Sequence, residues 1–159
     1  MENVVSHDVK QIWTPRILGI FCNWCSYTGA DGAGTARMQR PPVLRILRVM
    51  CSGRVEPEMV FRALKNGADG VIVSTCHAGD CHYIQGNFKT FRKASLITRF
   101  LEQMGVNPKR FVLANISASE GAELTKLINE YTEELLEIGP NPLNCKDNLS
   151  FKTIDEKEG

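Results

Sequence analysis

The sequence predicts an α/β fold in which helices cover both faces of a parallel sheet. Short apolar runs alternate along the 159 residues with segments of helical periodicity, and glycine or proline separates most of them. This alternation is typical of parallel β-α-β units with right-handed crossovers, and therefore of a three-layer α/β sandwich. The length suits one compact domain, and a hydrophobic content of 43% can supply its core.

Four apolar runs are the predicted strands. The first is Arg16 to Phe21, and the second is Val43 to Met50, whose two arginines indicate an exposed edge position. The third, Gly70 to Thr75, is apolar almost throughout, as expected for a strand buried on both faces. The fourth is Arg110 to Ile116. A flavodoxin-like parallel sheet of four or five strands accommodates them.

Helices are predicted between and after these strands. Residues 56–67 have proline in the first turn and glycine at the stop. After residue 81, a helix of about twenty residues is predicted from apolar spacing. Its predicted buried face consists of Ile84, Phe88, Phe91, Ala94, Ile97, Leu101 and Met104. The last helix opens at a capping box, Ser117 to Glu120. Its predicted buried stripe is Leu124, Leu127, Ile128, Tyr131, Leu135 and Ile138.

The remaining segments complete the predicted organisation. We expect an N-terminal arm over residues 1–14, an α/β domain over 15–140 and a polar tail over 141–159. No apolar run approaches the roughly 20 residues of a membrane-spanning helix, and the N-terminus lacks a secretory signal pattern. A soluble cytoplasmic protein is therefore expected. With 19 basic and 18 acidic residues, composition gives no electrostatic reason to expect nucleic-acid binding.

Cysteine is the informative residue type. Six cysteines are many for a reducing compartment, where disulfides are rare and metal or redox chemistry gains weight. Carboxyl ends of parallel strands share one edge of the sheet, so residues that follow them should converge there. The cysteines at or just after the first three predicted strands are Cys22, Cys25, Cys51, Cys76 and Cys81. Chance burial of small apolar thiols would instead scatter them, so a shared site is predicted. Cys145, in the tail, stands apart.

Four thiolates can hold zinc or an iron-sulfur cluster. A structural zinc usually holds together loops that lack an apolar core. This chain can form such a core, so it has little need of a structural zinc. The CxxC and CxxxxC spacings occur in plant-type two-iron ferredoxins, and the continuous C-x2-C-x2-C-x3-C run of four-iron ferredoxins is absent. Spacing therefore modestly favours a [2Fe-2S] cluster. Five candidates for four places leave one spare, and Cys22 and Cys25 are the pair that we would exclude first.

Residues around the cysteines have candidate supporting roles. His77 and His82 each follow a cysteine directly. We expect them to donate hydrogen bonds to the ligands or to lie at the surface, because adjacent residues rarely both reach one iron. Trp24 either shields the site or simply packs. The same loop offers backbone N–H groups to sulfur at Ala78, Gly79 and Asp80.

Two other stretches of the sequence have weaker functional indications. GADGAG, Gly29 to Gly34, fits neither a dinucleotide nor a P-loop motif, so a conformationally permissive loop is expected over Thr28 to Pro42, with room for a short helix. One predicted helix is basic, which is typical of a solvated face and could dock an acidic partner. Its basic residues are Lys89, Arg92, Lys93 and Arg99.

The motifs CNWC, CSGRVEPEMV, GADGV and CHAGDCHY, in this order, closely resemble the delta subunit of the methyl-viologen-reducing [NiFe] hydrogenase of methanogenic archaea. The resemblance spans about Pro15 to Pro142. It implies a [2Fe-2S] cluster and electron transfer from a hydrogenase, or in some organisms a formate dehydrogenase, to the FAD-containing subunit of heterodisulfide reductase. The ligand pool that it implies is Cys22, Cys25, Cys51, Cys76 and Cys81.

The sequence thus predicts a small electron-transfer subunit without a substrate site of its own. Two alternatives stay open. A thiol oxidoreductase would use Cys22 and Cys25 as a CxxC pair, and would leave the other cysteines unexplained. A zinc-stabilised adaptor would have no redox role and no visible absorbance.

Overall fold

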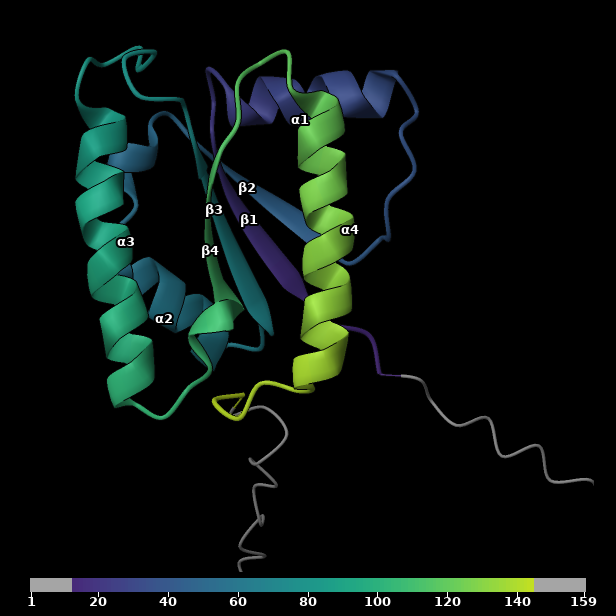
Figure 1. Cartoon of the computed structure of the whole chain (residues 1–159), viewed down its shortest axis with the longest axis vertical. Coiled ribbons are helices and arrows are strands. Elements are labelled where there is room, and N and C mark those ends of the chain that lie inside the picture. The colour runs from purple at the N-terminus through teal and green to yellow at the C-terminus, as the bar shows by residue number, and fades with distance from the viewer. Residues whose placement is uncertain (1–12, 145–159) are drawn as a thin grey trace, which may run out of the picture.

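A computed structural model describes residues 13–144, and these form one α/β unit. Four parallel strands make a single sheet in the order β2-β1-β3-β4 (Figure 1). The strands are β1 (Ile17–Cys22), β2 (Leu44–Val49), β3 (Gly70–Thr75) and β4 (Phe111–Asn115). The four predicted strands are confirmed, each within one residue at either end. Most of the predicted arm and tail, and Cys145, lie outside the described residues.

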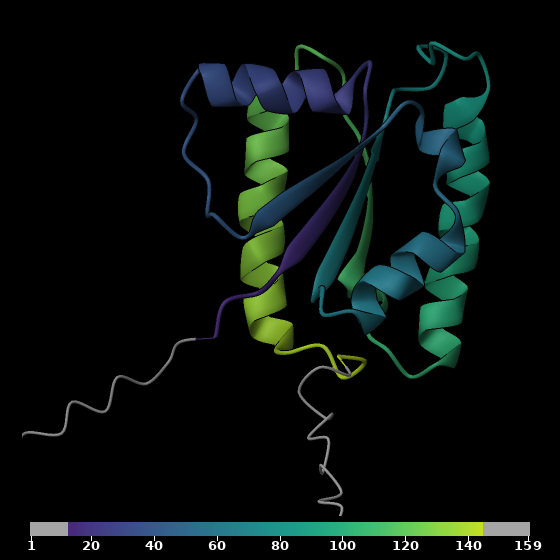
Figure 2. The same ribbon diagram turned by 180° about the vertical axis from the view of Figure 1, so that it is seen from behind.

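Helices cover both faces of the sheet, as the three-layer prediction requires. Figures 1 and 2 show α1 and α4 on one face and α2 and α3 on the other. The helices are α1 (Ser26–Thr35), α2 (Pro57–Lys65), α3 (Gly86–Gln103) and α4 (Gly121–Ile138), with 3-10 turns η1 (Ser52–Arg54) and η2 (Pro108–Arg110). This arrangement of helices on both faces of a parallel sheet is the predicted flavodoxin-like sandwich. No helix among residues 13–144 is long and apolar enough to cross a membrane.

The burial of the strands follows their place in the sheet. All six residues of β3 are buried, because β1 and β4 flank it and helices cover both faces. Strand β2 lies at an edge and has only half-buried and exposed residues, as its arginines predict. Two apolar cores result, one under α2 and α3 and the other under α1 and α4.

The buried face of α3 differs from the prediction at both ends. Ile84 precedes the helix and is 78% exposed, and Phe88 and Met104 are also exposed. The helix instead buries Gly86, Asn87, Thr90, Ala94, Ile97 and Leu101. The physical reason is that its first turn packs against η1 and the cysteines, where only small or hydrogen-bonded residues fit. Apolar periodicity alone therefore misplaced this turn.

The start of α4 also needs correction. The helix begins at Gly121, so SASE forms the turn before it rather than its first turn. One half of the capping box is present, because the Ser117 N–H donates to the Glu120 carboxylate at 2.7 Å. The Ser117 hydroxyl bonds Ser119 instead of the helix backbone. The predicted buried stripe of α4 is confirmed, with Leu127 and Ile138 half-buried.

The glycine-rich segment forms a ten-residue helix, α1, rather than mainly a loop. Gly29 faces the start of α4, where a Cβ would lie 2.8 Å from the Ser117 carbonyl oxygen. Gly121 on α4 is equally close, because its Cβ would lie 2.9 Å from the Gly29 carbonyl oxygen. These glycines let two helices approach closely at the carboxyl end of the sheet, which places the start of α1 beside the strand ends.

At the opposite end of the sheet, a buried arginine ties three segments together. Arg110 is 2% exposed, and its guanidinium donates to the carbonyl oxygens of Asp69, Gly139 and Pro140 at 2.8–3.0 Å. The Asn141 side-chain amide donates to the carbonyl oxygens of Leu64 and Ala68. This network fastens the chain after α4 to the amino end of the sheet, far from the cysteines.

Candidate metal centre

Five buried cysteines gather at the carboxyl ends of β1, β2 and β3. They are at most 8% exposed and form one cluster, which consists of Cys22, Cys25, Cys51, Cys76 and Cys81. Each comes from a strand end or from the loop after it. The parallel topology therefore brings together residues that are up to 59 positions apart (Cys22 to Cys81). The convergence predicted from the strand ends is what the structure shows.

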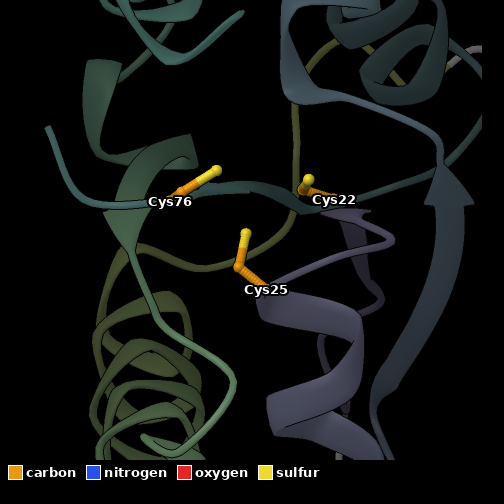
Figure 3. A group of neighbouring side chains, drawn as sticks. All are labelled: Cys22, Cys25 and Cys76. Carbon is orange, nitrogen blue, oxygen red and sulfur yellow. The ribbon is translucent and has the colours of Figure 1, made fainter. Parts of the chain in front are cut away.

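Three of the thiols form a compact group. The sulfur atoms of Cys22, Cys25 and Cys76 all lie within 4.8 Å of one another, and Figure 3 shows them pointing toward a common space. Cys25 is the N-cap residue of α1, so the start of that helix fixes its position beside Cys22. Cys22 and Cys25, the pair that we would exclude first from the sequence alone, thus lie together in the compact group.

The other two thiols flank Gly86, at the first residue of α3. A Cβ at this position would overlap the Cys51 sulfur and lie 3.0 Å from the Cys81 sulfur. The φ angle of Gly86 is not in the left-handed region, so the backbone alone does not demand glycine. Glycine is instead required by the space that the two sulfur atoms occupy. No role for Gly86 was predicted from the sequence. The only signal in the sequence was that this glycine follows the cysteine loop closely.

A buried hydroxyl network supports the loops that carry the cysteines. Ser52 and Thr75 share a hydrogen bond of 2.7 Å between their hydroxyl groups, and the Thr90 hydroxyl donates to Ser52 at 2.9 Å. Ser52 follows Cys51 and Thr75 precedes Cys76, so the network ties two cysteine positions to α3. The Asn87 amide adds a bond to the His77 carbonyl oxygen at 2.7 Å. The available sequence signal was that Thr75 lies in an apolar strand and that Asn87 and Thr90 lie in a predicted helix.

The thiols in the Cys22–Cys25 pair have opposite tendencies to ionise. A hydrogen bond from the Cys25 thiol lowers the pKa of Cys22 to about 5, and backbone N–H groups assist. The same contact raises the pKa of Cys25, and burial raises it further. The contact between the two thiols thus favours a thiolate within the pair.

Burial and backbone N–H donors determine the direction in which the pKa values of the remaining thiols shift. Burial raises the pKa of Cys51, and it raises the pKa of Cys76 to about 11. Burial also acts on Cys81, but the N–H groups of Tyr83, Asn87 and Gly86 together outweigh it and lower the pKa of that thiol. The start of α3 thus favours negative charge on Cys81, as helix N-termini do.

The side chains of His77 and His82 have partners away from the thiols. His77 Nε2 lies 2.7 Å from the Glu120 carboxylate, and the ring of His82 stacks on Trp24 at 4.0 Å between centroids. Trp24 Nε1 donates to the Tyr83 hydroxyl at 3.4 Å. Among the backbone donors that the loop offers, the Asp80 N–H is occupied by the His77 carbonyl oxygen. The histidines therefore hold the loop in shape from outside the thiol cluster.

The fold and these thiols define an α/β domain with a sulfur-only candidate metal centre at the edge of its sheet. A family model described as methyl-viologen-reducing hydrogenase, delta subunit, matches residues 17–139. The chain therefore belongs to the methyl-viologen-reducing hydrogenase delta-subunit family, as the resemblance predicted.

Curated relatives match most of the chain. An iron-sulfur subunit of the F420-non-reducing hydrogenase of Archaeoglobus profundus is 48% identical over 132 residues, which are 83% of this chain and 96% of the relative. An iron-sulfur subunit of the vhc F420-non-reducing hydrogenase of Methanococcus voltae is 47% identical over 128 residues, 80% of this chain and 89% of the relative.

A third relative is a much longer protein. It belongs to the ferredoxin/F420H2-dependent CoB-CoM heterodisulfide reductase of Methanosarcina acetivorans, and it is 42% identical over 142 residues. The match covers 89% of this chain but only 18% of that protein. A domain similar to this chain is thus part of the same polypeptide as a heterodisulfide reductase component in that organism.

Proposed function

We propose that the chain is an electron-transfer subunit that carries a [2Fe-2S] cluster. It relays electrons from a hydrogenase or a formate dehydrogenase to the FAD-containing subunit of heterodisulfide reductase in methanogenesis. The observation that carries the proposal is the cluster of five buried thiols from three separate segments at one end of the sheet. Four of the five would be ligands, drawn from Cys22, Cys25, Cys51, Cys76 and Cys81.

The donor set fits such a cluster. Soft thiolate donors favour iron-sulfur clusters and zinc, and the compact group at this site contains cysteines only. All five thiols are buried, so the protein would exclude water from most of the centre. Gly86 leaves the space beside Cys51 and Cys81, and backbone N–H groups favour the thiolate form of Cys81. When bound, a [2Fe-2S] cluster supplies reversible transfer of one electron.

The relatives support both halves of the proposed relay. Two of them are named as iron-sulfur subunits of hydrogenases. The matching domain inside a heterodisulfide reductase polypeptide supports that enzyme as the acceptor, since fusing two domains raises their effective concentration. A separate chain would reach the same partner by docking.

A thiol oxidoreductase remains the second candidate, because the low pKa of Cys22 is typical of a reactive CxxC pair. However, Cys22 and Cys25 are buried, and exchange needs an accessible sulfur. A zinc adaptor is the third candidate, since Cys22, Cys25 and Cys76 could hold one ion. Neither candidate explains why Cys51 and Cys81 share the space beside Gly86.

A reconstituted relay tests the proposal. The full-length chain, purified without oxygen, is mixed with the hydrogenase of its source organism under hydrogen, and its visible absorbance is followed. The absorbance should bleach, and it should recover when the oxidised FAD-containing subunit of heterodisulfide reductase is added. Cys76→Ala should show neither change, whereas Cys145→Ala, outside the five, is the matched control and should behave as wild type. A colourless wild-type chain that exchanges thiols would favour the oxidoreductase instead.

A further inference from the structure

Large apolar side chains are exposed around the buried thiols. We define the carboxyl-rim patch as Trp24, Met50, Tyr83, Ile84 and Phe88, which are between 42% and 78% exposed. Trp24 and Met50 are each adjacent in sequence to a cysteine of the cluster, and Tyr83 lies two residues after Cys81. Single exposed apolar residues are ordinary on protein surfaces, whereas several around one buried site indicate an interaction surface.

Contacts within the patch make part of it a continuous surface. The His82 ring lies between two patch members, stacked on Trp24 and edge-on to Tyr83 at 5.1 Å between centroids. The hydrogen bond from Trp24 to Tyr83 closes this aromatic group. The group connects the loop after β1 to the loop after β3, and both of these loops carry cysteines of the cluster. Rigid aromatic side chains of this kind are typical anchors in protein interfaces.

Ile84 gives an independent indication. Its φ angle is 68°, a left-handed conformation that β-branched residues strongly disfavour. It is also 78% exposed, so packing against residues 13–144 does not explain an isoleucine there. Glycine or asparagine would suit the backbone better. An apolar side chain held outward in an unfavourable backbone conformation is expected where the side chain itself binds something.

Charge beside the patch indicates what would bind. Lys89 and Arg92 are exposed on α3, just after Phe88, and no acidic group among residues 13–144 forms an ion pair with either. Lys93 differs, because it pairs with Glu56. The surface is thus apolar over the cysteines and positively charged along α3. A complementary protein surface would be apolar at its centre and acidic on one side.

We propose that the carboxyl-rim patch, flanked by Lys89 and Arg92, is the docking surface for the protein that accepts electrons from this chain. Its occupant is an acceptor protein with an apolar surface bordered by carboxylates, near its own electron-carrying group. Four of the five patch residues come from the same loops as the cysteines, and Phe88 comes from the first turn of α3, so docking here brings the two centres close together. The inference rests on the proposed function and adds the surface that the acceptor recognises.

Variants of one residue give the sharpest test. Ile84→Asn removes the apolar side chain while suiting the left-handed backbone, so the variant should melt at a higher temperature than wild type. Its affinity for the purified FAD-containing subunit of the source organism's heterodisulfide reductase should fall by about 10-fold or more. Leu136→Asn, on the exposed side of α4, is the matched control and should bind as wild type. Lys89→Glu with Arg92→Glu should slow association and weaken its salt dependence.

The outcomes separate this inference from the proposed function. Iron and sulfide content is measured on every variant, and binding is measured by titration independently of colour. A wild-type chain that holds iron and sulfide and binds the acceptor, with Ile84→Asn binding equally well, would overturn the docking surface alone. Loss of self-association in Ile84→Asn, seen by sedimentation, would show that a second copy covers the patch and would also overturn it. A wild-type chain without iron or sulfide would refute the proposed function itself.

Discussion

Replacing Gly86 by alanine tests the role of Cys51 and Cys81, the two thiols that lie outside the compact group. The added Cβ would overlap the Cys51 sulfur and lie 3.0 Å from the Cys81 sulfur. Because non-bonded atoms prefer separations of about 3.5–4.0 Å, the Cys51 sulfur would have to move by roughly 1 Å or more. Metal-sulfur distances tolerate deviations of only about 0.2 Å. The variant should therefore lose its cluster.

The fold should survive this change. Alanine is preferred over glycine inside a helix by about 1 kcal/mol, while crowding in a packed site costs about 1–3 kcal/mol. The net loss of stability of the metal-free chain is then about 0–2 kcal/mol, which most domains tolerate. Loss of the cluster without loss of the fold is the expected signature.

The assay compares iron and acid-labile sulfide per chain with the urea denaturation of the metal-free protein. Gly32→Ala is the matched control, because Gly32 lies in α1 and a Cβ there meets nothing within 4 Å. That variant should keep its iron and gain about 0.5–1 kcal/mol. A Gly86→Ala chain with wild-type iron and sulfide would show that Cys51 and Cys81 are not both required ligands, and the steric explanation for Gly86 would be wrong.

Three further predictions concern single residues. Cys76→Ala should lose iron and keep its helical circular dichroism, because its thiol packs within the cysteine cluster rather than in either apolar core; retention of iron would contradict its place among the ligands. Thr90→Val removes hydrogen bonds to Ser52 and to the Gly86 carbonyl oxygen, and should lower unfolding free energy by about 1–2 kcal/mol in urea and speed iron loss to a chelator. Arg110→Met leaves three carbonyl oxygens without their charged donor. It should lower the free energy of unfolding by about 2–4 kcal/mol and leave the iron content unchanged. A change in iron content would show that the two ends of the sheet are coupled.

The sequence predicted the elements well where one physical signal dominated. Strand β3 is buried on both faces, so its apolar run marks both of its ends, and Gly70 to Thr75 is the observed strand. The arginines of β2 marked an edge strand because charged side chains avoid the sheet interior. The gathering of cysteines followed from topology alone, since parallel strands end at one edge.

The first turn of α3 could not be predicted from periodicity. Its buried residues include Gly86, Asn87 and Thr90, whose environment is set by the cysteines and by η1 rather than by an apolar core. Phe88 points outward for the same reason, although it continues the apolar spacing. Similarly, the nearness of Cys25 to Cys76 depends on where α1 begins, which no local spacing reveals. Tertiary contacts at the site override the local pattern in each case.

Whether these thiols hold an electron-carrying cluster is best measured by iron and acid-labile sulfide analysis of the anaerobically purified chain, with electron paramagnetic resonance before and after dithionite. We expect about two irons and two sulfides per chain, and a signal that appears only on reduction. Zinc without sulfide, or no metal at all, would contradict an electron-carrying role for the five cysteines.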